Sequence, residues 1–138
     1  NKEVIQFNTK TIPFRDNTFD SVISIAVLHH ICSKIQRINS IKELVRVAKH
    51  KGKILISVWG VHKNFQEGDN YIKWELQSKY NGNTEKKVYQ RYYYLYSIDE
   101  LLNDISENIR NVNVLSHYSN FNNSLYQRFF FLLDSSSV

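Results

Sequence analysis

The stretch Phe19-Asp-Ser-Val-Ile-Ser-Ile-Ala-Val-Leu-His-His30 decides the fold, because its apolar and β-branched residues run almost without interruption. Such a run does not alternate, and it is typical of a strand buried on both faces of a parallel sheet. Ser33 and Gln36 then fit a capping box, followed by an amphipathic helix that we expect to end at Gly52. Lys53–Trp59 follows as a second apolar strand. Strand, helix and strand at this spacing predict a βαβ unit, a mostly parallel sheet and the α/β class.

The remaining apolar runs complete the predicted sheet. Three further strands are expected: Val4–Phe7, Asn111–Tyr118 and Leu125–Leu133. The last two are separated by a turn-rich segment, so they predict a closing antiparallel hairpin. Ser97 is the expected N-cap of a helix that runs to about Ile105. Residues 61–88 have weak periodicity, so we expect a long irregular insertion with at most a short helix around Tyr71–Tyr80.

Composition excludes several classes of protein. A chain of 138 residues has the length of one domain, and 42% apolar with 22% charged residues is ordinary for a globular protein. The single cysteine, Cys32, excludes a disulfide framework and a multi-cysteine metal site. No apolar run is long enough for a membrane span, and no signal peptide opens the chain. We expect a cytoplasmic protein, with the nucleus as a second location, and the absence of methionine suggests a piece of a longer chain.

The net charge of +5 is concentrated in the predicted helix and the strand after it. Between Lys34 and Lys53, basic residues face a single acid, Glu43. Five of them form what we call the basic stripe: Lys42, Arg46, Lys49, Lys51 and Lys53. A local field of this sign favours polyanions such as RNA, and the alternative is an ordinary solvated helix face.

Chemistry is expected beyond the carboxyl ends of the strands, where ligands bind in open α/β sheets. His29 and His30 lie there, directly after the most apolar run. Adjacent histidines point in different directions and do not chelate one metal, so no metal site is expected. Cys32 is interpreted as a buried, small apolar residue, and a nucleophilic role is the less favoured alternative.

A second cluster is Arg91-Tyr-Tyr-Tyr-Leu-Tyr96. Aromatic rings interleaved with a guanidinium can stack on bases and hold phosphates or carboxylates. The alternative is an aromatic strand that packs on the sheet.

Three segments together resemble a class I S-adenosylmethionine-dependent methyltransferase: Ile12-Pro-Phe-Arg15, the stretch 19–30 and Gly52-Lys-Ile-Leu-Ile-Ser-Val-Trp59. The series is similar, more narrowly, to the eukaryotic wobble-uridine tRNA methyltransferases that esterify 5-carboxymethyluridine. That family includes a methyltransferase domain fused to an AlkB-like oxygenase. Residues 91–96 match the family's segment RYYHLY, with Tyr94 in place of its histidine, and residues 69–74 are similar to its QDVFVPW.

The resemblance implies roles for particular residues. It implies S-adenosylmethionine as cofactor, bound by Asn8, Thr9, Ile25, Ala26, Val27 and His29, where Asn8 replaces the usual Asp at the adenine. Asn8 retains an oxygen that accepts a hydrogen bond. His30 would shape the methyl pocket, while Arg91 and Tyr92 would hold the carboxymethyl group or the anticodon backbone. A carboxylate is ionised at neutral pH, so its methylation needs positioning rather than a general base.

The resemblance also implies a domain plan and partners. Residues 1–138 would be the carboxyl-terminal part of one methyltransferase domain, with 1–60 as cofactor-side core, 61–88 as insertion and 89–138 as substrate side. The N-terminal strands and glycine-rich loop would precede it, so we expect the chain to be inactive alone. The partners would be the tRNA anticodon loop and a small zinc-binding activator subunit at the edge strand near Val4–Phe7. A small-molecule methyltransferase and a non-catalytic RNA-binding relative remain as alternatives.

Overall fold

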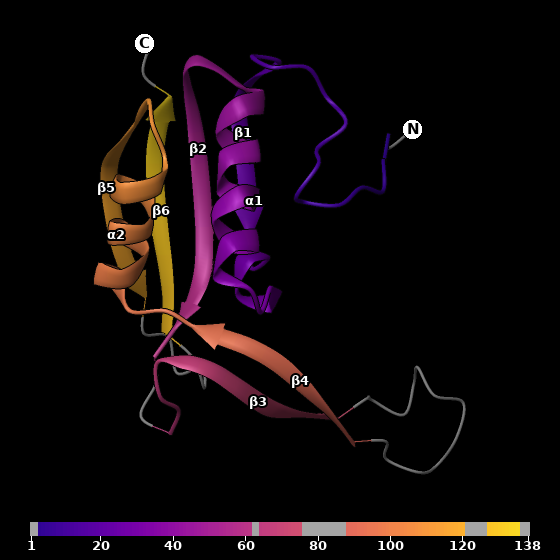
Figure 1. The fold of residues 1–138 in the computed structure, drawn as a ribbon. Coiled ribbons are helices and arrows are strands. Elements are labelled where there is room, and N and C mark those ends of the chain that lie inside the picture. The colour runs from indigo at the N-terminus through magenta and orange to yellow at the C-terminus, as the bar shows by residue number, and fades with distance from the viewer. Residues whose placement is uncertain (1–2, 62–63, 76–87, 121–126, 136–138) are drawn as a thin grey trace.

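The computed structural model describes residues 3–61, 64–75, 88–120 and 127–135. Its main sheet has four strands in the order β1-β2-β6-β5. The bounds are Phe19–Ile25 for β1, Ala48–Gly60 for β2, Val112–Asn120 for β5 and Gln127–Ser135 for β6. β1 and β2 are parallel, whereas β6 is antiparallel to both β2 and β5 (Figure 1). The predicted α/β class and the closing antiparallel hairpin are therefore confirmed.

The helix between the parallel strands, α1, spans Lys34–Val47. Its N-cap is the predicted one, because Ser33 accepts a hydrogen bond from the backbone N–H of Gln36. The predicted end at Gly52 is wrong, since the helix stops at Val47 and Gly52 lies inside β2. A side chain at Gly52 would place its Cβ 2.7 Å from the carbonyl oxygen of Lys49. The glycine is therefore required by a close backbone approach within the strand.

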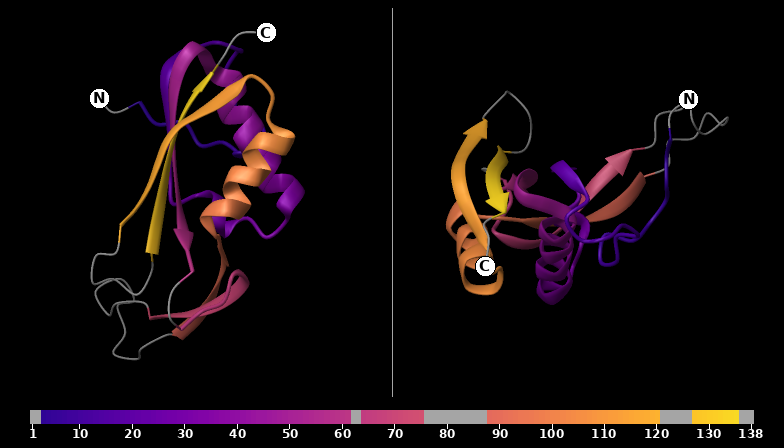
Figure 2. Two further views of the ribbon diagram at one scale, coloured as in Figure 1. Left: turned by 90° about the vertical axis from the view of Figure 1, so that its left-hand side faces the viewer. Right: turned by 90° about the horizontal axis from the view of Figure 1, so that it is seen from above.

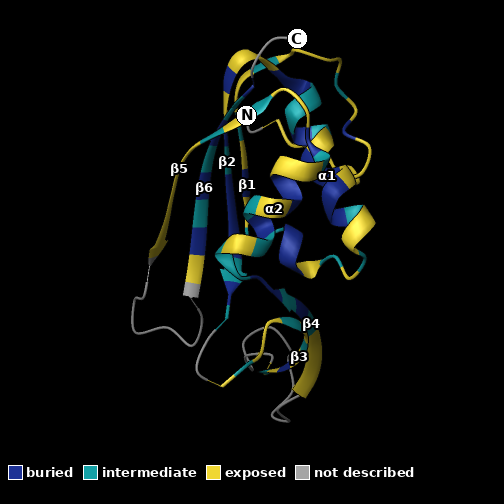
Figure 3. Ribbon diagram, turned by 60° about the vertical axis from the view of Figure 1, so that its left-hand side comes forward, coloured by how far each residue is buried: buried dark blue, intermediate teal, exposed yellow. Residues whose placement is uncertain are grey.

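Both helices pack on one face of the sheet (Figure 2). The second, α2, spans Ile98–Asn108 and begins at the predicted N-cap, Ser97, which accepts from the N–H of Glu100. Most of the buried apolar side chains come from α1, α2, β2 and β6, and the two strands contribute alternate residues. Figure 3 shows stretches of buried residues on these elements in dark blue. Ile54, Ile56 and Phe131 are fully buried at the centre of this layer.

The opposite face of the sheet has no covering helix among the described residues, and this changes the expectation for β1. Ile23 and Ile25 are 67% and 48% exposed, so β1 is not buried on both faces as the sequence predicted. Its apolar run is typical of a strand that lies between two other strands of a sheet. Among the described residues, however, β1 pairs with one strand, β2. The helices of the described residues lack the length and hydrophobicity of a membrane-spanning segment.

A two-stranded antiparallel arm extends from the end of the main sheet. It consists of β3, Gly68–Glu75, and β4, Val88–Leu95. The predicted irregular insertion with a short helix at 71–80 is therefore wrong for residues 71–75, and residues 76–80 lie outside the described residues. The arm is joined to the sheet because Tyr96 donates its N–H to the carbonyl of Trp59, at 3.1 Å.

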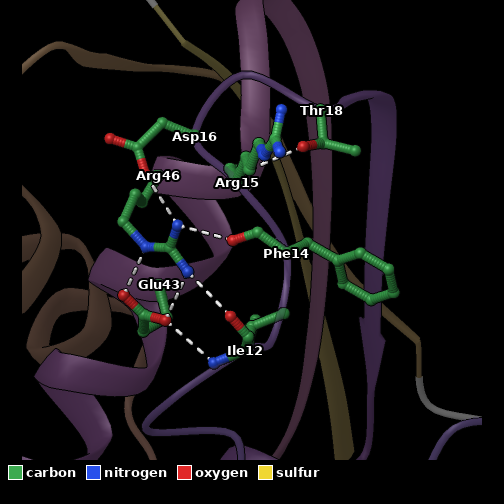
Figure 4. A network of polar contacts seen from close by, with 7 residues as sticks. All are labelled: Ile12, Phe14, Arg15, Asp16, Thr18, Glu43 and Arg46. Carbon is green, nitrogen blue, oxygen red and sulfur yellow. Dashed lines mark hydrogen bonds and ion pairs between the residues drawn. The ribbon is translucent and has the colours of Figure 1, made fainter.

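The N-terminal segment lies against α1 without forming the predicted strand. Residues 3–7 have no regular secondary structure, and Val4 and Ile5 are 84% and 57% exposed, because no described strand pairs with them. The segment is held further along by Arg46, which donates to the carbonyl oxygens of Ile12 and Phe14 (Figure 4). The same guanidinium pairs with Glu43 and with Asp16, drawn beside it in Figure 4.

Candidate functional site

The chain turns sharply where β1 ends. Ala26 has a φ of 57° and donates its N–H to the carbonyl of Ser57 on β2, at 2.9 Å. A short 3-10 helix, η1, follows at Leu28–His30. The turn separates the two histidines, because His29 is fully buried while His30 is exposed. Both lie at the carboxyl ends of the parallel strands, where the sequence predicted the site.

Four rings meet at this edge, and we call them the aromatic cluster: His29, His30, Trp59 and Tyr93. Trp59 and Tyr93 stack with centroids 4.6 Å apart and an interplanar angle of 2°. His29 lies against both, at 4.9 Å from Trp59 and 5.6 Å from Tyr93. The cluster therefore joins the end of β1, the end of β2 and the arm, and it gives the edge an aromatic wall.

His29 is neutral at physiological pH. Burial lowers its pKa to about 3, with smaller contributions from the positive charges of His30 and Arg128. Its Nδ1 accepts the backbone N–H of Trp59 at 3.1 Å, which places the proton on Nε2. That Nε2 is buried and has no hydrogen-bond partner among the described residues. The Nδ1 of His29 thus accepts a hydrogen bond that holds the end of β2, while its buried Nε2–H has no acceptor among the described residues.

Arg91 and Tyr92 do not converge on one point. Successive residues of a strand project to opposite faces. The guanidinium of Arg91 lies over the ring of Trp74, 3.8 Å from its centroid. The Tyr92 hydroxyl instead donates to Asp69 Oδ1 at 2.5 Å, and burial together with this bond raises the pKa of Tyr92. The backbone carbonyl of Tyr92 lies 3.4 Å from His30 Nδ1.

Tyr94 belongs to a partly buried polar network. Its hydroxyl bonds to Glu100 Oε1, and the guanidinium of Arg37 lies 3.5 Å from its ring centroid. Arg37 is 2% exposed and donates to the carbonyl oxygens of Ile31 and Cys32. These bonds fix the turn that directly follows the two histidines.

Cys32 itself is exposed, so its predicted burial is wrong. The backbone carbonyl oxygen of Cys32 accepts a hydrogen bond from the buried guanidinium of Arg37, whereas the side chain of Cys32 is exposed.

The predicted cofactor residues do not all line one pocket. Thr9 and Val27 line one pocket of about 320 Å³, together with Ser24 and a mostly apolar wall. Asn8 is exposed, and its Oδ1 accepts the N–H of Lys10 within a local turn. Ile25 ends β1, and Ala26 forms the turn after it. A few hydroxyls on an apolar wall suit the adenosyl part of S-adenosylmethionine, so Thr9, Val27 and Ser24 fit that group.

The basic stripe lies at the end of the sheet opposite the arm (Figure 1). Three of its members are paired: Arg46 with Glu43 and Asp16, Lys49 with Asp20 at 2.9 Å and Lys53 with Asp134 at 3.7 Å. Lys42 and Lys51 are exposed. With Arg46 and Arg110, Lys42 lines a groove of about 620 Å³ between α1 and α2. The stripe is thus separate from the aromatic cluster, and its field is partly neutralised.

Sequence reasoning missed Trp74, Asp69 and Arg128 as members of this region. Trp74 was part of the similar segment, but without the strand pairing nothing placed it beside Arg91. Arg128 lies opposite Trp59 in the β2–β6 register. The sequence did contain a signal for Arg128, because a basic residue stands at the start of the final predicted strand. A strand antiparallel to β2 begins where β2 ends, so its first residues lie at the same edge as the site.

Sequence comparison supports the methyltransferase interpretation. Residues 1–56 match the family described as a methyltransferase domain. The probable tRNA methyltransferase 9B of Mus musculus is 39% identical over 75 residues, which cover 52% of this chain and 17% of that protein. The tRNA (carboxymethyluridine(34)-5-O)-methyltransferase of Schizosaccharomyces pombe is 32% identical over 110 residues, covering 65% of this chain and 48% of that protein. The chain spans less than half the length of each of these relatives.

Solved structures share the fold at low sequence identity. An S-adenosylmethionine-dependent methyltransferase from Methanosarcina mazei has a TM-score of 0.74 at 14% identity, and the match covers 96% of this chain and 66% of that one. The 1,6-didemethyltoxoflavin-N1-methyltransferase of Burkholderia thailandensis, solved with S-adenosylhomocysteine, has a TM-score of 0.68 at 10% identity, covering 96% and 50%. The sequence match and the shared fold confirm the resemblance and identify a class I, S-adenosylmethionine-dependent methyltransferase fold in this chain.

Proposed function

We propose that the protein methylates tRNA, and that its substrate group is the carboxymethyl group of 5-carboxymethyluridine at the wobble position. The observation that carries the proposal is the aromatic cluster at the carboxyl ends of β1 and β2, in a chain similar to relatives named for this reaction. S-adenosylmethionine supplies a methyl group on a positively charged sulfur. Trp59 is half-buried and His30 is exposed, so these two rings of the cluster suit the face of a nucleobase.

The residues of the site position a nucleophile that is already activated. A carboxylate with a pKa near 4 is ionised at neutral pH, so no side chain has to remove a proton from it. His29 fits this role as a neutral, water-excluding wall, because it stays uncharged. Alignment of the reacting groups can lower the barrier by roughly 7–11 kcal/mol, and it is the main task of such a site.

Among the described residues, Arg91 and Arg128 are the cations that we consider for the carboxymethyl group or the adjoining phosphates. Arg91 lies on the arm, and Arg128 lies close enough to His29 to lower its pKa. Tyr92 has its hydroxyl committed to Asp69, so it would serve the substrate only after exchanging that bond. We therefore assign Arg91 the contact to the adjoining phosphates and His30 the mouth of the pocket. The basic stripe would attract the rest of the tRNA from the far end of the sheet.

The predicted activator subunit is a further part of this proposal. Residues 4–7 expose apolar side chains, with Val4 84% and Phe7 45% exposed, and this suits a segment that pairs with another chain. Replacing Val4 with Asp should weaken co-purification of a zinc-binding activator, whereas Glu3→Gln should not.

The function is tested by methyl transfer from labelled S-adenosylmethionine, using the full-length protein with its activator. The substrates are one tRNA with 5-carboxymethyluridine at the wobble position and the same tRNA with uridine there. We expect label only in the first, released by mild base as an ester is. Transfer to both tRNAs would contradict the proposed group, and transfer to neither would contradict the proposed function.

A further inference from the structure

The arm continues the aromatic cluster on one of its faces. Cross-strand partners share a face, and the register pairs Trp74 with Tyr89, Ile72 with Arg91 and Asn70 with Tyr93. Tyr93 belongs to the aromatic cluster, so Trp74, Tyr89 and Arg91 lie on the same face further out along the arm. We call these three residues the arm stack. Each step of two residues along β4 advances about 6.8 Å.

The arm stack holds a guanidinium flat and accessible. Arg91 is exposed, and its guanidinium carbon lies 3.8 Å from the centroid of the Trp74 ring. Tyr89 lies beside Trp74, with ring centroids 6.2 Å apart. Among the described residues, none of the ion pairs involves Arg91. One plane of the guanidinium rests on Trp74, which leaves its other plane and its charge for a ligand.

We infer that the arm stack binds a nucleotide of single-stranded RNA next to the one in the aromatic cluster. The inference rests on the proposed function and extends it to a flanking nucleotide. A base stacks on an aromatic ring or on a guanidinium plane, and the same guanidinium attracts the phosphate. The other face of the arm is less suitable, because among the described residues its two carboxylates, Asp69 and Glu75, outnumber its one cation, Lys73.

The contact would be insensitive to base identity. Every base has a π-face, whereas the arm stack presents rings and a guanidinium rather than a fixed hydrogen-bond pattern. The arm stack would therefore strengthen RNA binding without selecting a sequence, and the modified nucleotide itself would be chosen at the aromatic cluster.

The test is binding of a fluorescent seven-nucleotide oligouridylate by anisotropy, without cofactor, compared with an oligomer of the same length that lacks its bases. Trp74→Leu keeps an apolar side chain without the indole, and Arg91→Lys keeps the charge without the plane. We expect each substitution to lower the affinity for the intact oligomer at least five-fold, which corresponds to the lower end of the energy of one stacked base. The affinity for the abasic oligomer should fall less than two-fold. Tyr71→Ala is the matched control, since Tyr71 is 68% exposed on the other face, and it should stay within two-fold.

Two outcomes would overturn the inference: unchanged binding in both variants, or equal weakening of the intact and abasic oligomers. As a check that does not depend on variants of the arm, Trp59→Phe leaves Trp74 as the single tryptophan, whose emission the intact oligomer should quench. Absence of quenching would also overturn it. If RNA binding depends on Trp74 but the full-length protein transfers no methyl group, the proposed function alone is contradicted. If the methyl group is transferred but binding does not depend on Trp74, this inference alone is contradicted.

Discussion

Replacing His29 with Gln should flatten the dependence of stability on pH. His29 is fully buried, and burial is the main reason that its pKa falls from about 6.5 to about 3. The unfolded chain therefore binds a proton at this residue in a range of pH where the folded chain does not. Stability from this group is present above the unfolded pKa, and it is lost as pH falls from about 6.5 toward 3.

The size of the effect follows from the two pKa values. Between pH 7 and pH 5 the unfolded histidine takes up most of a proton, whereas His29 in the fold takes up almost none. At about 1.4 kcal/mol per pKa unit, this step lowers the free energy of unfolding by about 2 kcal/mol. Gln does not titrate, and its side-chain oxygen can still accept the backbone N–H of Trp59.

Urea denaturation of wild type and His29→Gln at pH 7 and pH 5 measures this difference. The loss of unfolding free energy between the two pH values should be smaller in the variant by about 2 kcal/mol. Groups shared by the two proteins cancel in the comparison. An equal loss in wild type and variant would refute the reasoning, because it would mean that His29 takes up its proton in the folded state.

Three further substitutions test the packing around the site, each by the free energy of unfolding. Gly60→Ala should cost about 1–3 kcal/mol, because its Cβ would lie 2.1 Å from the ring of Phe129, and Phe129→Leu should restore part of that loss. Arg46→Ala should cost about 2 kcal/mol, since its bonds to charged and carbonyl partners hold the N-terminal segment. Tyr94→Phe should cost about 1–2 kcal/mol, more at pH 8 than at pH 5, because it removes a donor from the ionised carboxylate of Glu100.

Controls separate these effects from general damage. Lys42→Ala, on the exposed side of α1, should stay within about 0.5 kcal/mol of wild type, and a larger effect would mean that loss of positive charge alone explains Arg46→Ala. Additive losses in the Gly60 and Phe129 double variant would contradict the proposed clash. For Tyr94→Phe, an equal cost at both pH values would contradict the bond to the ionised carboxylate. Burial raises the pKa of Glu100, so its ionised form depends on that bond.

Local signals predicted the elements that depend on short-range patterns. The N-caps Ser33 and Ser97 and the run 19–25 correspond to the helix starts and to β1 in the structure, because capping and apolar periodicity act within a few residues. The position of His29 and His30 followed from topology, because the carboxyl ends of parallel strands share one edge.

Long-range pairing could not be predicted in the same way. The arm depends on the register between β3 and β4, which are separated by more than ten residues, and neither strand shows clean alternation. Arg46 was predicted to bind nucleic acid because it is basic, yet its partners Ile12 and Asp16 lie about 30 residues away in the sequence. Arg37 is likewise basic in the sequence and 2% exposed in the fold. The sequence shows how many basic residues a segment contains. It does not show which of them are paired, because that depends on the carboxylates and carbonyls that the fold brings near.

The central claim is that the wobble nucleotide binds at the aromatic cluster and not along the basic stripe. Photo-crosslinking of a tRNA with 4-thiouridine at the wobble position, in the presence of S-adenosylhomocysteine, tests this directly when the linked peptides are identified by mass spectrometry. If the wobble nucleotide binds at the aromatic cluster, crosslinks form within 26–32, at Trp59 or within 89–96. Crosslinks confined to the groove lined by Lys42 and Arg110 would contradict this claim.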